Sequence, residues 1–226
     1  MKIKDLQALF VQQLKDLYSA EKQLTKALPR MAKAASHDDL RQAFQSHFEE
    51  TRQQQQRLEE VFGQLDVSPR GTRCAAMAGL IEEAEEALED VSEPEVRDAA
   101  LICAAQRVEH YEIAGYGCVR SLAEQLGMSD LAGQLQQTLE EEKKSNEKLN
   151  KMALGHINKE AAQSGSGNRE SGSERSEGRR GNGHAHGESE GRQHRSTQRS
   201  SEERMGEKER DLERERAMGQ AAEQVD

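Results

Sequence analysis

The sequence predicts an all-α protein built on a four-helix bundle, and three observations lead to that prediction. Four segments carry apolar residues at intervals of three and four positions, which is the period of a helix with one face against a core. Each of these apolar stripes also contains at least one glutamate. Finally, the second and third segments are joined by the 29 residues 63–91, far more than a hairpin turn needs.

The apolar stripes place the four helices. We expect the first helix at about residues 4–34 and the second at about residues 38–62. The third opens at residues 92–95 (SEPE), the pattern of a capping box with proline in the first turn, and the fourth spans about residues 130–156. The stripe residues are, in chain order, Leu6, Phe10, Leu14, Leu17, Leu24, Leu28 and Met31; Leu40, Phe44, His47, Leu58 and Val61; Leu101, Ala105, Val108, Tyr116 and Val119; and Leu131, Leu135, Leu139, Leu149 and Met152.

The glutamates in the stripes need an explanation, because burying an unpaired carboxylate costs several kcal/mol. Glu21 and Glu50 lie at equal distances from the turn between the first two helices. Residues 36–39 (SHDD) in that turn have the pattern of an N-cap at Ser36 with an acid three residues on. Glu112 and Glu142 lie at equal distances from the turn between the last two. Gly127 is expected to end the third helix there, and Ser129 to cap the fourth. At a rise of about 1.5 Å per residue, the two acids of each hairpin reach the same height. The sequence therefore predicts four carboxylates, one from each helix, at one level of the core.

The long connection predicts the order of the helices. Ser68, Pro69 and Gly71 mark a loop, and residues 74–88 repeat apolar positions as a short amphipathic helix does. A connection of this length can return along the bundle, so that the third helix starts beside the beginning of the second. A long crossover from the second to the third helix (B to C, when the bundle helices are lettered A to D) is typical of ferritin-like bundles. It distinguishes them from simple up-and-down bundles.

Carboxylates that converge from several helices are the ligands of di-iron and di-manganese bundle proteins. Both metals take carboxylate oxygen together with some imidazole nitrogen. The candidate metal ligands are Glu21, Glu50, Glu109, Glu112, Glu142 and His47. We therefore predict a di-iron or di-manganese centre in the core.

Three further side chains are expected beside this centre. Gln54 is placed to hydrogen-bond a carboxylate. Tyr18 and Tyr116 each lie one helical turn from a candidate glutamate, where they can donate to a ligand or carry a radical. Plain packing in the core is the competing interpretation for both tyrosines.

The alternative for any single glutamate is a position at the rim of the bundle, solvated or paired with Lys or Arg. Four acids at matched heights favour a metal centre over four separate rim positions. Di-iron bundles commonly carry Glu-x-x-His on two helices, whereas here Gln53 and Ser145 stand three residues after Glu50 and Glu142. An all-carboxylate site and a site that uses His47 are both open, as is His47 as a hydrogen-bonded core residue.

Composition divides the 226-residue chain at about residue 163. Residues 163–226 contain 10 of the 18 glycines and none of the seven aromatic residues, so they cannot bury a core. We predict a folded domain at residues 1–162 and a disordered, charged, low-complexity tail at residues 163–226. Residues 183–187 (GHAHG) carry two histidines within reach of a divalent metal, with a solvated linker as the alternative.

Charge and composition argue against several classes of function. The net charge of −10 disfavours nucleic acid or an anionic membrane as the main partner. No apolar run approaches the length of a membrane span, and the amino terminus lacks the apolar region of a secretory signal. Three widely spaced cysteines suggest neither a disulfide framework nor a zinc motif. These features predict a reduced, cytoplasmic protein.

Five sequence motifs also carry a family resemblance. They are residues 16–24 (DLYSAEKQL), 47–51 (HFEET), 74–83 (CAAMAGLIEE), 108–114 (VEHYEIA) and 139–143 (LEEEK). Together they resemble the YciE/YciF-type ferritin-like proteins, in order and over about residues 1–160.

The resemblance implies a rubrerythrin-like bundle, commonly dimeric, that is associated with bacterial stress responses and has no established reaction. It implies metal ligands at the five glutamates named above. One departure from the family pattern is Asn146, where aspartate is expected in close relatives.

Two functions follow from these expectations. The first is a di-metal protein that oxidises bound Fe(II) with peroxide or oxygen and so limits oxidative damage. The second is a non-catalytic stress protein, a homodimer whose bundle and charged tail bind or protect other macromolecules. A storage cage of the ferritin kind is a third and weaker hypothesis, because no feature of the sequence indicates cage assembly. Whether the protein is an enzyme is left open at this point.

Overall fold

The computed structural model describes residues 3–170, and all regular structure in that range is helical. The predicted all-α fold is therefore confirmed. The helices are α1 (Leu6–Ala34), α2 (Asp38–Gln64), α3 (Ala75–Asp90), α4 (Pro94–Gln125) and α5 (Ser129–Met152), followed by a π-helical turn, η1 (Ala153–Ile157), and α6 (Asn158–Glu170).

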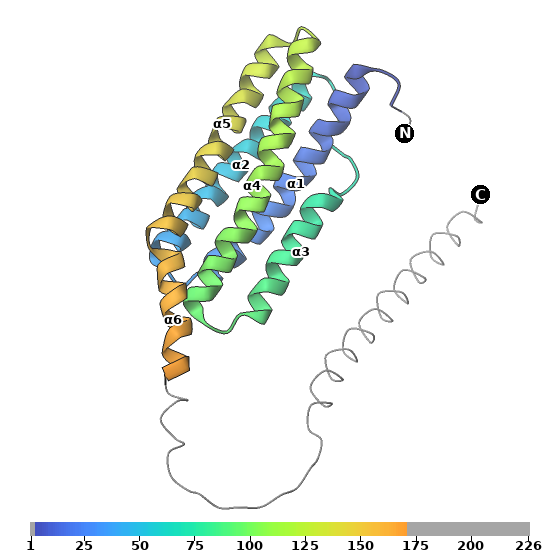
Figure 1. Ribbon diagram of the computed structural model, residues 1–226. Coiled ribbons are helices and arrows are strands. Elements are labelled where there is room, and N and C mark those ends of the chain that lie inside the picture. The colour runs from blue at the N-terminus through green and yellow to red at the C-terminus, as the bar shows by residue number, and fades with distance from the viewer. Residues whose placement is uncertain (1–2, 171–226) are drawn as a thin grey trace, which may run out of the picture. The chain divides into compact units, whose positions relative to one another are not determined.

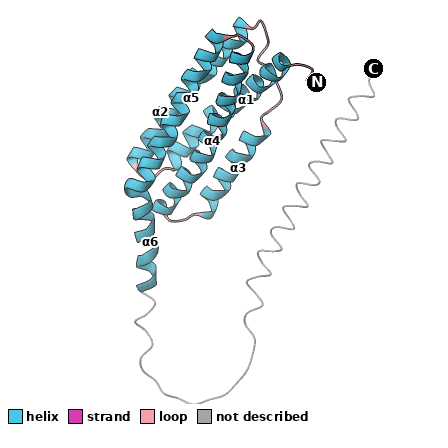
Figure 2. Ribbon diagram, turned by 45° about the horizontal axis from the view of Figure 1, so that its top comes forward, coloured by secondary structure: helices cyan, strands magenta, loops and turns pink. Residues whose placement is uncertain are grey.

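Four long helices, α1, α2, α4 and α5, form the bundle (Figure 1). The closest pairs are the two hairpins, α1 with α2 and α4 with α5. Helices α2 and α4 run in the same direction, because the connection between them returns along the bundle. Within that connection, α3 packs against α4 and α1. The predicted crossover with its short helix is confirmed, and Figure 2 shows α3 beside the four-helix core from a second direction.

The core consists of two apolar clusters, one toward each end of the bundle. The cluster at the α1–α2 turn includes Leu28, Met31, Leu40, Phe44 and Ile102. The cluster at the α4–α5 turn includes Phe10, Leu14, Val61, Phe62 and Leu135. In every bundle helix the candidate metal ligands lie between residues of these two clusters, so the acids occupy a middle layer of the core.

The turn between α1 and α2 is held by a buried acid from α4. The Oδ1 and Oδ2 atoms of Asp98 accept the backbone amides of Ser36 at 2.8 Å and His37 at 2.7 Å. His37, rather than Ser36, is the N-cap of α2, and its Nδ1 accepts the Asp39 amide at 3.2 Å. Ser36 therefore lies one residue before the N-cap of α2, where its backbone amide is bonded to Asp98.

Two other predicted caps are also wrong by one position. Glu93 is the N-cap of α4 and makes no side-chain bond there, although Pro94 does begin the helix. Met128 precedes α5, and Ser129 is its first helical residue. Gly127 ends α4 as predicted, with a φ angle of 73° that favours glycine.

The last helix continues beyond its predicted end. It passes His156 through the π-helical turn and reaches Glu170, so residues 163–170, which composition assigns to the tail, are helical. The Ser164 hydroxyl donates to the Ala161 carbonyl at 3.0 Å, a bond that lies within the helix. The rest of the predicted tail lies outside the described residues, and the domain boundary stays a prediction. None of the helices in residues 3–170 is long and apolar enough to cross a bilayer.

The Asp98 contact predicts a stability effect. Asp98→Ala leaves the amides of Ser36 and His37 without acceptors, which should lower the free energy of unfolding by about 2–4 kcal/mol. Urea unfolding followed by circular dichroism measures this loss. Asp98→Asn, which keeps one acceptor oxygen, should lose less. Equal stability of the alanine variant and the parent protein would contradict this role.

Candidate metal centre

The middle layer of the core is made of ionisable side chains from all four bundle helices. We call it the polar layer: Glu21 from α1, His47 from α2, Glu109 and Glu112 from α4, and Glu142 from α5. All five side chains are buried, and Glu21 and Glu142 are 0% exposed. This burial follows from the apolar stripes, because the helix faces that carry these residues must turn inward to bury their leucines.

Four members of the polar layer are close enough to hold one ion together. One ligand atom from each of His47, Glu109, Glu112 and Glu142 lies within 4.8 Å of the others. The Nε2 atom of His47 is 3.3 Å from Oε1 of Glu109 and 4.0 Å from Oε2 of Glu142. A small side-chain adjustment would bring one nitrogen and several carboxylate oxygens around a single cation.

Most of the ligand atoms in the polar layer have no hydrogen-bond partner. The unpartnered buried atoms are Glu21 Oε2, His47 Nε2, Glu109 Oε2, Glu112 Oε1, and both Oε1 and Oε2 of Glu142. Buried acceptors without donors are rare and costly in folded proteins. Their concentration in one layer is a pattern that a bound cation would satisfy.

No lysine or arginine in residues 3–170 supplies that cation. None of them forms an ion pair with Glu21, Glu109, Glu112 or Glu142, and the ion pairs of this layer all involve His47. The rim interpretation, in which each acid is solvated or salt-bridged, is therefore wrong for these four glutamates.

The pKa values show the cost of this arrangement. Burial raises the pKa of Glu112 and of Glu142 well above the usual range, and the charges of the neighbouring acids raise them further. Burial also raises the pKa of Glu109 and brings that of Glu21 to about 7. For His47, burial lowers the pKa, but Glu109 and Glu50 outweigh that effect, so the net shift is upward. Without a cation, the layer must hold protons in place of a metal.

Glu21 is oriented by a buried tyrosine, as predicted for Tyr116. The Tyr116 hydroxyl donates to Oε1 of Glu21, and Tyr116 is fully buried. Tyr18 instead donates to Oε1 of Glu59 at 2.6 Å, so its predicted contact with a ligand is not formed. The two tyrosines differ because only Tyr116 lies on the inward face of its helix.

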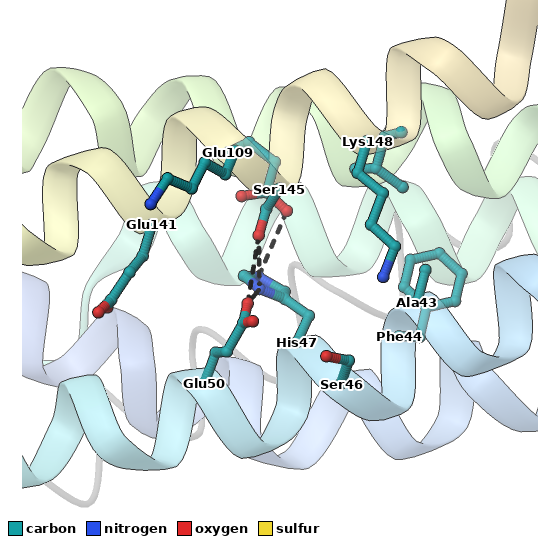
Figure 3. A pocket seen from close by; sticks show the side chains of 11 residues that line it. Ala43, Phe44, Ser46, His47, Glu50, Glu109, Glu141, Ser145 and Lys148 are labelled. Carbon is teal, nitrogen blue, oxygen red and sulfur yellow. Dashed lines mark hydrogen bonds and ion pairs between the residues drawn. The ribbon is translucent and has the colours of Figure 1, made fainter.

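Glu50 lies beside the polar layer rather than in it. Its side chain is 45% exposed, and its Oε2 atom is 3.6 Å from Nδ1 of His47. The Ser145 hydroxyl donates to the same oxygen at 3.5 Å (Figure 3). The bond with His47 lowers the pKa of Glu50, in contrast to the buried acids. The predicted role of Glu50 as a ligand stays a prediction.

Gln54 does hydrogen-bond a carboxylate, but not that of a candidate ligand. Its Nε2 atom donates to Oε2 of Glu141 at 3.2 Å. Glu141 also accepts both guanidinium NH groups of Arg57, at 2.9 and 3.0 Å. These hydrogen bonds of Glu141 with Gln54 and Arg57 join α2 to α5 next to the polar layer.

A cavity of about 220 Å³ leads to the polar layer between α2 and α5. His47, Glu50 and Glu109 line it, together with the apolar side chains of Phe44 and Leu149. Lys144, Ser145 and Lys148 also line it, and Figure 3 shows Lys148 and Glu50 on different sides of His47. A small solute can therefore reach His47 and Glu109, although both are buried.

One polar cluster beside the centre was not predicted. The Tyr111 hydroxyl donates to Oδ2 of Asp16 at 2.5 Å, and the Cys74 thiol donates to the same oxygen at 3.3 Å. Cys74 also lies within electrostatic range of Glu112, whose pKa is raised mainly by burial. The three residues are far apart in the sequence, and no spacing pattern connects them.

Comparisons with known proteins identify the family of the chain and agree with its fold. Residues 5–162 match the family described as a domain of unknown function, DUF892. Protein YciF of Escherichia coli is 49% identical over 162 residues, which is 71% of this chain and 98% of that protein. The crystal structure of this E. coli stress protein matches the present structure with a TM-score of 0.67. The match covers 70% of the present chain and 99% of the E. coli chain. The structure of YcfI from Rhodopseudomonas palustris is 46% identical, covers 66% of this chain and 95% of its own, and has a TM-score of 0.65.

These matches span the bundle and every residue of the polar layer. The YciF-type resemblance seen in the sequence motifs is thereby confirmed. The chain belongs to the DUF892 family of YciF-like helical proteins.

Proposed function

We propose that the polar layer binds divalent iron or manganese and that the protein is a metal-dependent member of a stress-related family. One observation carries the proposal. Six buried ligand atoms of five side chains have no hydrogen-bond partner, and no lysine or arginine of residues 3–170 forms an ion pair with the four glutamates, whose ion pairs are with His47 alone. A hard divalent cation satisfies such acceptors and offsets the repulsion between them.

The residues divide into distinct roles. His47, Glu109, Glu112 and Glu142 converge most closely and form the first ion site. Glu21, whose charge helps raise the pKa of Glu112, adds the carboxylate for a second ion and is held in place by Tyr116. Glu50 lies at the cavity, where it supports His47 and is the most exposed of the three acids that line it.

Bound iron would supply the electrons that reduce peroxide or oxygen. The chain contributes the surroundings for that chemistry. The two apolar clusters exclude water from either end of the layer, and the cavity admits a small oxidant on the His47 side. We therefore propose oxidation of Fe(II) at this centre, as in the first of the two hypotheses above.

The description of the E. coli relative as a stress protein is equally consistent with the non-catalytic alternative. It requires no metal. A homodimer and a cytoplasmic location are part of both proposals.

Metal content separates the two functions. The full chain, produced without an added histidine tag, should contain close to two iron or manganese ions per chain by elemental mass spectrometry. Glu109→Gln combined with Glu142→Gln should abolish loading, because two converging carboxylates lose their charge. Glu140→Gln is the matched control, since Glu140 lies on α5 but its side chain pairs with Lys143 at the surface. Absence of metal after exposure to Fe(II) or Mn(II) would refute the proposal.

Replacing Glu21 should have opposite effects on loading and on metal-free stability. Glu21→Gln keeps an oxygen that can accept from Tyr116 but removes the buried charge. Metal loading should fall, whereas the melting temperature of the metal-free protein should rise by several degrees at about pH 8. Glu140→Gln, at a surface acid of α5 outside the layer, should leave that temperature nearly unchanged. A clear destabilisation by Glu21→Gln would show that the carboxylate has a structural partner.

The metal-free protein should lose stability as the pH rises. The pKa of Glu21 goes from 4.5 to about 7 on folding, and those of Glu109, Glu112, Glu142 and His47 also rise. A group with a raised folded pKa stabilises fully below its unfolded pKa, and this stability is lost as the pH passes the folded value.

The free energy of unfolding measured with a chelator present should therefore fall between about pH 5 and about pH 8. Acids with lowered pKa values, such as Glu50 and Glu141, act below this window. Saturating metal should reverse the trend, because ligands bind metal in their deprotonated form. Metal-free stability that increases across the same range would contradict the charge distribution derived above.

A further inference from the structure

A second group of metal-ligating side chains lies at the end of the bundle that carries the α1–α2 turn. It consists of His37, the N-cap of α2; Asp39, in the first turn of α2; and His156, in the π-helical turn η1. We call it the end cluster. His156 is 14 residues beyond Glu142, about 21 Å along a continuous helix, so the end cluster is separate from the polar layer.

The geometry of the end cluster is that of three ligands around one point. One ligand atom from each of the three side chains lies within 4.8 Å of the others. The imidazole rings of His37 and His156 are 4.4 Å apart between centroids, with their planes at 40°. Two imidazoles and one carboxylate are thus brought together from segments more than a hundred residues apart in the chain.

His156 provides the independent indication of a ligand. Its Nε2 atom is buried and has no hydrogen-bond partner, although an imidazole nitrogen normally finds one. The residue sits in a π-helical turn, a local distortion that is frequent at functional sites. The distortion lies where α5 passes into α6 and brings His156 against His37.

The α1–α2 turn is held in a fixed position for this role. Asp98 accepts the amides of Ser36 and His37, which anchors the backbone that carries the first imidazole. The His37 ring accepts the Asp39 amide at 3.2 Å through Nδ1. Binding of a cation at His37 breaks at most this one long hydrogen bond. The Asp39 amide lies in the first turn of α2 and can donate to water instead.

We propose that His37, Asp39 and His156 form a second metal site, selective for Zn²⁺ or Cu²⁺. Two imidazole nitrogens and one carboxylate oxygen suit borderline divalent ions, in contrast to the carboxylate-rich polar layer. Three protein ligands leave the fourth position of a tetrahedral ion open to water. When bound, the ion ties the start of α2 to the end of α5 and stabilises the bundle. This site does not depend on the proposed function of the polar layer.

Electron paramagnetic resonance with Cu²⁺ tests the site directly, because it counts coordinating imidazoles. The polar layer contains one histidine, so only the end cluster offers a two-nitrogen signal within residues 3–170. The test uses the full chain with His184, His186 and His194 replaced by Asn, which removes the remaining histidines of the tail. One equivalent of Cu²⁺ should give a two-nitrogen signal.

The variants decide the outcome. His37→Asn and, separately, His156→Asn should each reduce the signal to one nitrogen and remove the rise in melting temperature caused by one equivalent of Zn²⁺. His110→Asn is the matched control and should change neither, because His110 is exposed on α4 and bonds only the Gln106 carbonyl. Glu109→Gln with Glu142→Gln should keep the two-nitrogen signal, which separates this site from the polar layer. A two-nitrogen signal that survives both histidine variants, or that never forms, would overturn the proposal.

Discussion

The main constraint on this structure is the mutual repulsion among its buried carboxylates. Glu21, Glu109, Glu112 and Glu142 are excluded from water, and no lysine or arginine of the described chain pairs with them. Each alone would be expensive to bury; together they also raise one another's pKa values. In the proposed metal-bound form, a divalent ion would offset this cost. The apolar clusters on either side supply the stability that lets the bundle hold such a layer.

Packing between the helices differs around the polar layer. The α2–α5 seam is open enough to contain a cavity, whereas α4 and α5 pack closely along their length. The cavity reaches His47 and Glu109, which are the candidate ligands nearest to solvent. The two sides of the polar layer therefore differ. The side at Tyr116 is fully buried, whereas the side at His47 opens into the cavity.

Much of the fold and part of the site were predictable from the sequence. Apolar periodicity predicts the helices, and the lengths of the connections predict the crossover, because both are local properties of the chain. The spacing of Glu21, Glu112 and Glu142 predicts their common height. It does not predict helix rotation to better than part of a turn, which is why Glu50 was grouped with buried acids and lies half-exposed. The contact of Tyr111 with Asp16 depends on tertiary packing, which leaves no local pattern.

The most direct test of the account is an anomalous-scattering map from crystals of the full chain soaked in Mn²⁺. The account predicts a peak enclosed by His47, Glu109, Glu112 and Glu142, with a second peak toward Glu21. Ligand distances should be near those of carboxylate and imidazole bonds to a divalent metal, about 2.0–2.3 Å. A map with no peak in the polar layer, and with water molecules or a lysine or arginine side chain bonded to these acids instead, would contradict the account.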